Sequence, residues 1–121
     1  MSKEPYIPVV NRRESCKLAF SDICYVYRTN RKVRFETEYG EKYMYTKMDD
    51  VEKSLGPEFF RCMSGCIVNM SRIKDMRDRI VFFDDGKTIK LGRESFVKLH
   101  QKYNAYLHGL LREREENGDA D

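Results

Sequence analysis

The sequence lacks tryptophan, has only three prolines and two histidines, and contains no long apolar run. No stretch approaches the roughly 18 apolar residues that a membrane-spanning helix needs. The first ten residues, MSKEPYIPVV, lack the apolar centre of a signal peptide. These absences predict a cytoplasmic protein that does not insert into a membrane.

Metal and catalytic motifs are missing as well. The four cysteines, Cys16, Cys24, Cys62 and Cys66, have no CxxC spacing, and both histidines lie far along a helical stretch. We therefore expect free thiols, no disulfide and no metal. No acid–base constellation can be named, so the sequence predicts neither an enzyme nor a bound cofactor.

What is present fits one globular domain with a heavily solvated surface. The 121 residues are 40% hydrophobic and 36% charged, with a formal net charge of +3. The chain closes on an acidic stretch, so we expect a domain over residues 1–111 and an acidic, disordered tail over residues 112–121. A modestly positive domain is compatible with nucleic acid but does not demand it.

Residues 59–73, FFRCMSGCIVNMSRI, organise the rest of the chain. Two apolar runs flank the small polar pair Ser64 and Gly65, which predicts a strand, a tight bend and a second strand, with Arg61 on the first strand. Asn69 follows the second run, where its side-chain amide can bond the backbone and bend the chain. We expect Asn69 to have a structural role.

Short segments with strand chemistry cover most of the remaining chain. They are residues 6–10, 16–20, 23–27, 32–38, 42–45, 73–76, 80–83 and 88–91. A capping box from Thr46 to Asp49 predicts a short helix over residues 47–55, and an apolar stripe from Phe96 to Leu110 predicts a C-terminal helix whose stripe packs in the core. The pattern predicts an α+β domain, predominantly β, in which residues 1–14 form an N-terminal extension with an edge strand.

The stretch 59–73 closely resembles the signature of the LytTR family of bacterial DNA-binding domains. That signature runs Phe-x-Arg-x-His-x-Ser-aromatic-Ile/Val-Val-Asn, followed four residues later by Ile. The matching residues are Phe59 or Phe60, Arg61, Ile67, Val68, Asn69 and Ile73. Met63 and Gly65 stand where the family usually has His and Ser. The order and spacing of the other motifs extend the resemblance over residues 15–107.

The resemblance implies a fold of short antiparallel sheets with a short helix and a C-terminal helix. It implies a sequence-specific DNA-binding domain of a bacterial transcriptional regulator, the output domain of a two-component response regulator. Such domains read double-stranded DNA from loops of a β scaffold and commonly occupy paired repeats, so two copies on DNA are implied. A receiver domain or a partner regulator is also implied, and the sequence leaves open whether this is an output domain cut from a longer protein or a stand-alone regulator.

Three stretches are candidates for contacting DNA. The segment from Arg28 to Arg34 holds four positive charges and no acid, and it is either a solvated hairpin end or, as the resemblance implies, a DNA-contacting loop. The bend at residues 63–64 either faces a groove or packs inward. The third stretch opens the last helix, where exposed N–H groups favour a phosphate. Arg61 either carries a charge on the surface of the sheet or contacts the DNA backbone. The predicted DNA-binding residues are Arg28, Asn30, Arg31, Lys32, Arg34, Arg61, Met63, Ser64 and Arg93.

Departures from the family pattern leave a second hypothesis open. Met63, Gly65, Gly92 and Glu94 replace residues that are usually polar or basic in the family. Their loss would suit a LytTR-fold interaction module that no longer binds DNA and modulates a partner regulator. Phosphate contacts alone retain much of the affinity of such an interface, which favours DNA binding.

Overall fold

The computed structural model describes residues 5–116, which form ten strands, two α-helices and two short 3-10 turns. The strands are β1 (Tyr6–Val10), β2 (Ser15–Ala19), β3 (Ile23–Thr29), β4 (Lys32–Thr37), β5 (Gly40–Tyr45), β6 (Phe59–Met63), β7 (Cys66–Asn69), β8 (Ile73–Arg77), β9 (Ile80–Phe83) and β10 (Thr88–Lys90). The helices are α1 (Met48–Ser54) and α2 (Arg93–Glu116), and the turns are η1 (Phe20–Asp22) and η2 (Met70–Arg72).

The strands form three antiparallel sheets. The largest has the order β5-β4-β3-β7-β6, the second has the order β10-β9-β8, and β1 pairs with β2. Gly40 (φ of 122°) and Gly86 (φ of 95°) occupy the two hairpin turns that the sequence predicted, since glycine adopts positive φ at little cost. Asn30 has a φ of 57° in the β3–β4 turn, a conformation that asparagine tolerates. The predicted α+β, predominantly β fold is confirmed.

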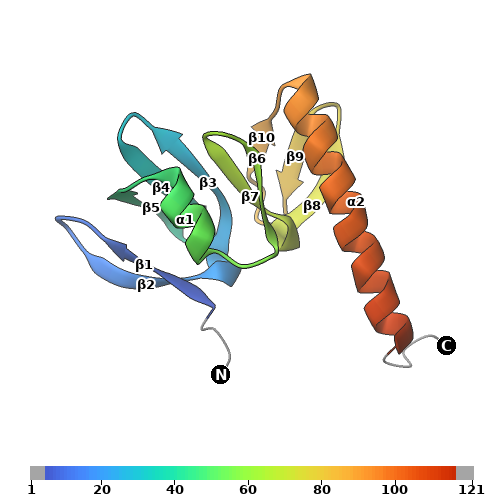
Figure 1. The fold of residues 1–121 in the computed structure, drawn as a ribbon, viewed down its shortest axis with the longest axis horizontal. Coiled ribbons are helices and arrows are strands. Elements are labelled where there is room, and N and C mark those ends of the chain that lie inside the picture. The colour runs from blue at the N-terminus through green and yellow to red at the C-terminus, as the bar shows by residue number, and fades with distance from the viewer. Residues whose placement is uncertain (1–4, 117–121) are drawn as a thin grey trace.

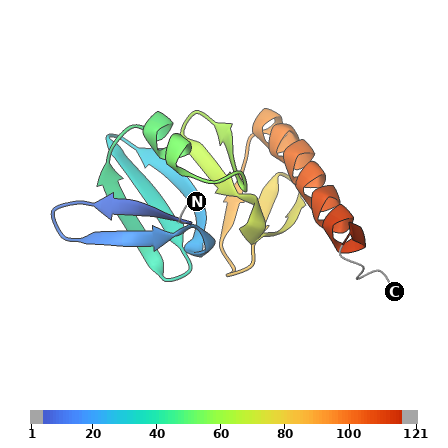
Figure 2. The same cartoon turned by 60° about the horizontal axis from the view of Figure 1, so that its bottom comes forward.

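Strand β7 is buried on both faces and lies between two hydrophobic cores. Ile67 belongs to the first core, which the β1–β2 hairpin and α1 cover, and Cys66 and Val68 belong to the second core, with β8, β9 and α2. Successive strand residues point to opposite faces of the sheet, so the unbroken apolar run in β7 is explained by a hydrophobic core on each face. Figures 1 and 2 show the hairpin and α1 on one side of the molecule and the small sheet with α2 on the other.

Asn69 holds the bend after β7. Its side chain is completely buried, and its Nδ2 donates to the carbonyls of Phe20 (3.1 Å) and Ile23 (2.8 Å). Its Oδ1 accepts from the backbone N–H (3.0 Å) and the hydroxyl (2.7 Å) of Ser71. The amide therefore joins η1 to η2, and the structural role predicted for it is confirmed.

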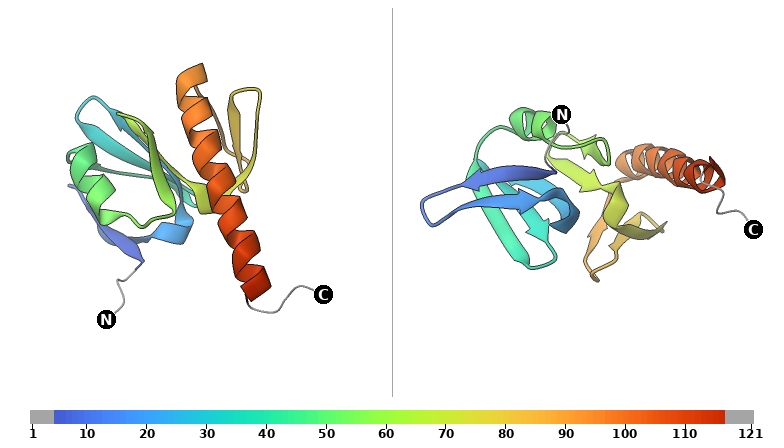
Figure 3. Two further views of the ribbon diagram at one scale, coloured as in Figure 1. Left: turned by 45° about the vertical axis from the view of Figure 1, so that its right-hand side comes forward. Right: turned by 90° about the horizontal axis from the view of Figure 1, so that it is seen from below.

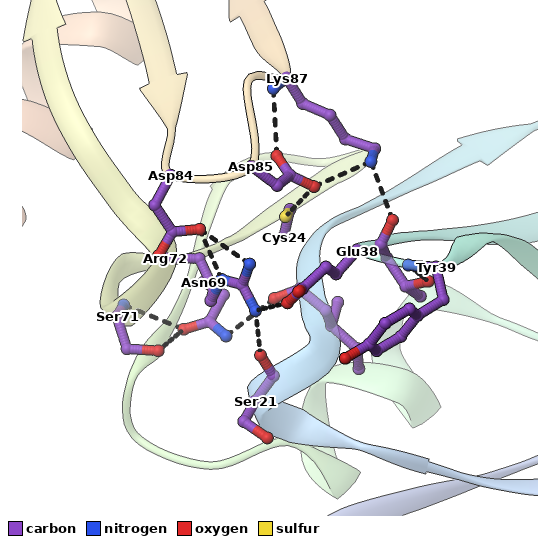
Figure 4. Close-up of polar contacts among 12 residues, drawn as sticks. Ser21, Cys24, Glu38, Tyr39, Asn69, Ser71, Arg72, Asp84, Asp85 and Lys87 are labelled. Atoms are coloured by element: carbon purple, nitrogen blue, oxygen red, sulfur yellow. Dashed lines mark hydrogen bonds and ion pairs between the residues drawn. The ribbon is translucent and has the colours of Figure 1, made fainter.

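A group of ion pairs, which we call the sheet latch, joins the five-stranded sheet to the three-stranded sheet (Figure 4). Arg72 pairs with Glu38 in the β4–β5 turn (3.0 Å) and with Asp84 after β9 (2.8 Å). Lys87 donates from Nζ to the Thr37 carbonyl at the end of β4 (2.8 Å). Because these residues lie at the η1 end of β3, the latch is at the opposite end of the sheet from the β3–β4 turn.

The capping box predicted for α1 is wrong. The helix begins at Met48, its N-cap residue is Lys47, and no side chain caps it. The carboxylate of Asp49 accepts instead from the guanidinium of Arg61 at 2.6 Å. A charge-assisted bond of this kind is stronger than a neutral capping bond, so the acid serves the tertiary contact.

Helix α2 is longer and less buried than the sequence predicted. Residues 112–116, expected in the tail, are helical, since Arg and Glu are strong helix formers; residues 117–121 of the expected tail lie outside the described residues. Leu99 and Tyr103 are buried, but Leu107 and Leu110 are 38% and 40% exposed, so only the first half of the stripe packs in the core. Figure 3 shows the helix running past the sheets. Neither helix in the described range is both long and apolar enough to cross a membrane.

Candidate nucleic-acid interface

Three connections meet along one edge of the molecule, which we call the loop edge. They are the β3–β4 turn, the β6–β7 turn and the junction between β10 and α2, and they lie along the top of Figure 1. The backbone N–H of Arg28 donates to the Gly65 carbonyl (3.0 Å), which ties the first connection to the second. A hollow of about 390 Å³ lined by Arg28, Met63 and Lys90 joins these two to the third. The predicted loops therefore come together in space.

A cleft of about 410 Å³ opens between the β3–β4 turn and α1. Its lining carries four cations, Arg28, Arg31, Lys47 and Arg61, and one carboxylate, Asp49. Cations gathered in a cleft raise the local positive potential and attract phosphate groups. Three of the four cations were predicted as DNA-binding residues from the sequence.

Arg61 lines this cleft and acts as a brace, because it holds the β6–β7 turn and α1 together. Its Nε and Nη2 donate to the Ser64 carbonyl (3.1 and 2.6 Å), and its Nη1 donates to Asp49 (2.6 Å) and Glu52 (3.0 Å). The hydrogen bond from Arg61 lowers the pKa of the Asp49 carboxyl. Arg61 therefore connects the β6–β7 turn to α1. From the sequence alone, this tertiary role could not be distinguished from that of an exposed charge on the sheet surface.

Replacing Arg61 with alanine tests whether this brace positions the β6–β7 turn or itself binds phosphate. We expect Arg61→Ala to weaken DNA binding while leaving the slope of log affinity against log salt unchanged, because the guanidinium already has partners. A direct phosphate contact would instead flatten the slope by about 0.9. Arg61→Lys is the matched control: it keeps the charge but not the planar donors that the turn uses, so it should weaken binding too. Wild-type affinity in Arg61→Lys would contradict the positioning role.

Met63 and Ser64 are exposed at the tip of the β6–β7 hairpin, and Met63 is 45% exposed. The interpretation that Met63 packs inward is therefore wrong. Met63 is the last residue of β6, next to the turn, and its side chain lines the hollow beside Lys90 instead of packing within the second core. Met63 offers only apolar contact to a partner, whereas Ser64 can donate or accept.

Substituting Met63 with histidine should change recognition and not stability. Because the side chain is exposed, we expect Met63→His to leave the melting temperature unchanged. The imidazole adds a donor that methionine lacks, so DNA affinity should rise, or the base preference at one or two positions should change by up to about 1 kcal/mol. Thermal melting and titration with DNA variants measure both effects. Unchanged affinity and unchanged preference would remove this position from the interface.

Lys32 and Arg34 lie on the opposite face of the β3–β4 hairpin from the cleft. Their side chains alternate with the buried Val33, whose side chain is in the first core. Arg34 is paired with Glu41 on β5. The ammonium of Lys32 lies over the Tyr43 ring, 4.6 Å from its centroid. The basic segment predicted as one loop therefore divides between two faces.

Arg93 lies exposed in the first turn of α2, at the loop edge. The N–H of Phe96 donates to the Gly92 carbonyl (2.9 Å), so the helix starts at this junction with free N–H groups. Glu94 is also exposed in this turn, where a negative charge suits the helix dipole. Arg93 thus keeps the position that the sequence predicted for a phosphate contact.

Two exposed lysines at the loop edge were not predicted. Lys47 precedes α1 and lines the cleft, and Lys90 ends β10 beside Met63. Both are basic residues immediately next to an element boundary, which is a weak signal in a chain with 23 Lys and Arg. Only the tertiary structure brings them to the predicted loops.

None of the four cysteines is exposed, although Cys66 lines the hollow at the loop edge. Cys24, Cys62 and Cys66 are buried in the second core, and the Cys24 thiol donates to Asp85 (3.3 Å). Burial, with this hydrogen bond, raises the pKa of Cys24 to about 12, so its thiol stays protonated.

The absence of metal remains a prediction: native mass spectrometry in reducing buffer should give the mass of the chain alone. A mass higher by one zinc ion would contradict it.

A β scaffold that gathers cationic loops along one edge has the architecture of a nucleic-acid-binding domain. The chain belongs to the LytTR DNA-binding domain family, whose model matches residues 13–104. Its structure is similar to the LytTr DNA-binding domain of a response regulator from Bacillus cereus, with a TM-score of 0.70, 18% identity, and coverage of 84% of this chain and 97% of that chain. The search of curated proteins gives no match. The family resemblance inferred from residues 59–73 is confirmed.

Proposed function

We propose that this domain binds duplex DNA sequence-specifically through the loop edge, as the DNA-binding part of a bacterial transcriptional regulator. The observation that carries the proposal is the convergence of three connections, far apart in the sequence, on one edge, with exposed cations at two of them, the β3–β4 turn and the β10–α2 junction. A surface of this kind can meet phosphates at several points and place side chains against base edges between them.

The residues divide into two roles within this proposal. Arg28, Arg31, Lys47 and Arg93 are exposed cations that neutralise phosphates and set the position on the duplex. Asn30 and Ser64 lie at the tips of two turns, where their donors and acceptors can reach base edges, and Met63 can contact a thymine methyl group. Arg61 positions the turn that carries Met63 and Ser64.

Selection from a pool of random 30-base-pair duplexes tests the proposal without knowledge of the target. We expect rounds of binding and amplification to enrich a defined motif, and a gel shift to show specific binding 10³-fold or more tighter than to unselected DNA, on the order typical of specific complexes. If the chain is instead an interaction module that has lost DNA binding, no motif will be enriched. Equal, weak binding to all duplexes would show an electrostatic surface without sequence specificity.

We further propose that the domain acts as an output domain under a receiver domain or a partner regulator, with two copies on paired repeats. Support comes from the family and from the Bacillus cereus structure, which is part of a response regulator. The selected motif tests this arrangement directly. A repeated motif with constant spacing, bound in the gel shift by two protein chains per duplex, would support it. A single unrepeated motif bound by one chain would contradict it.

A further inference from the structure

The β3–β4 hairpin has a cationic recess on each of its two faces. The cleft described above lies on the α1 side. A second hollow, of about 490 Å³, lies on the other face and is lined by Thr29, Asn30, Arg31, Lys32, Arg34 and Tyr45. The turn residues Asn30 and Arg31 line both recesses, so the tip of the hairpin separates them. We call the second recess the outer hollow.

The opposite placement follows from the pairing of β4. Val33 and Phe35 are fully buried in the first core, so Lys32 and Arg34, which alternate with them, point to the other face of the sheet. Lys32 is directly opposite Tyr45 on β5, which brings that tyrosine into the outer hollow. Arg28 lies two residues beyond the buried Val26 on β3 and lines the cleft.

The outer hollow is prepared for an anion. Its lining has no carboxylate and three cations, of which Arg34 is paired with Glu41, so Lys32 and Arg31 are the charges that face an incoming anion; Glu41 also accepts from the Tyr27 hydroxyl (2.9 Å). The ammonium of Lys32 lies 4.6 Å from the Tyr43 ring centroid and 5.8 Å from that of Tyr45, so two cation–π contacts hold it in place. A cation held in advance loses less conformational entropy when it binds a ligand.

We infer that the outer hollow binds the phosphate backbone of the second DNA strand, so that the β3–β4 hairpin enters a major groove with one backbone in each recess. The major groove admits a two-stranded β ribbon, and each of its borders carries the phosphates of a different strand. A hairpin tip with cations on one face only would neutralise one border, whereas this tip has them on both. The inference rests on the proposed function and adds to it the residues that meet the second strand.

Strand-resolved ethylation interference on the selected duplex tests this inference, with each strand labelled in turn. For the parent chain we expect blocked phosphates on both strands, bordering the same groove. Lys32→Ala should lose interference on one strand only, and Arg28→Ala should lose it on the other. Each variant should bind about fivefold more weakly near 0.15 M salt, because it neutralises one phosphate fewer and each phosphate contributes about 0.9 to the salt slope. Lys32→Arg is the matched control and should keep the parent pattern.

The outcomes separate this inference from the function on which it rests. Two results would contradict the inference: Lys32→Ala keeps every interference signal and the parent affinity, or it loses interference on the same strand as Arg28→Ala. In either case the outer hollow does not bind the second strand, and the proposal of specific DNA binding is unaffected. If no duplex is enriched by the parent chain, the proposed function itself fails. Arg28→Ala should keep the melting temperature of the parent because Arg28 is exposed, and Lys32→Ala should lower it by only a few degrees, since it loses two cation–π contacts near the surface.

Discussion

Replacing Arg28, Arg31, Lys32 and Arg93 with alanine together should flatten the dependence of log affinity on log salt by about 3 to 4. Each neutralised phosphate contributes about 0.9 to that slope, because binding releases the counterion condensed on it. Three of the four side chains come from the β3–β4 hairpin and the fourth from the start of α2, so they can contact separate phosphates at the same time. Fluorescence titrations of one duplex between about 50 and 200 mM salt measure the slope.

A charge-matched control separates specific placement from net charge. Arg12, Arg13, Lys74 and Arg112 are exposed and lie away from the loop edge, on the β1–β2 connection, β8 and the distal half of α2. Their replacement with alanine removes the same four charges and should leave the slope close to that of the parent. Both variants should keep the parent circular dichroism spectrum. Equal slopes for the parent and the loop-edge variant would remove these residues from the interface.

The largest effect on stability is expected at Asn69. Asn69→Ala removes the donor to two buried carbonyls and the acceptor for the Ser71 N–H and hydroxyl. A buried polar group left without its partner costs about 1–3 kcal/mol, so we expect the free energy of unfolding to fall by about 3–5 kcal/mol. For a domain of this size the melting temperature should fall by more than about 10 °C. Urea unfolding and calorimetry measure both quantities.

Ser71→Ala is the control for this prediction. It removes only the hydroxyl that donates to Asn69 Oδ1, and the backbone N–H of residue 71 still satisfies that oxygen. We therefore expect a loss of about 1 kcal/mol, the net contribution of one hydrogen bond. A loss for Asn69→Ala no larger than that for Ser71→Ala would show that the buried amide does not hold η1 and η2 together.

The elements that follow from local chemistry could be predicted from the sequence. The signature stretch folds as strand, two-residue turn and strand, because its apolar runs and the pair Ser64 and Gly65 determine that geometry within fifteen residues. The role of Asn69 could also be predicted, since an amide after a strand bonds the backbone close to it. The glycine turns at Gly40 and Gly86 were predicted for the same reason.

Features that depend on contacts between distant residues could not be predicted. The ion pair of Asp49 with Arg61 replaced a capping bond because the two residues meet only after β6 packs beside α1. The basic segment from Arg28 to Arg34 reads as one loop, but strand alternation sends its side chains to two faces. Lys47 and Lys90 join the interface through the fold alone.

Under the proposed function, the sheet latch affects the length of duplex that the loop edge contacts. The β3–β4 turn belongs to the five-stranded sheet, whereas the start of α2 follows the three-stranded sheet, and the second core packs between the two sheets. The separation between these two sites therefore depends on the angle between the sheets, which the second core sets and which Arg72 and Lys87 restrain further from the far end. Under the proposed function, we expect the number of base pairs between the outer contacts to depend in part on Arg72 and Lys87, two side chains remote from the duplex.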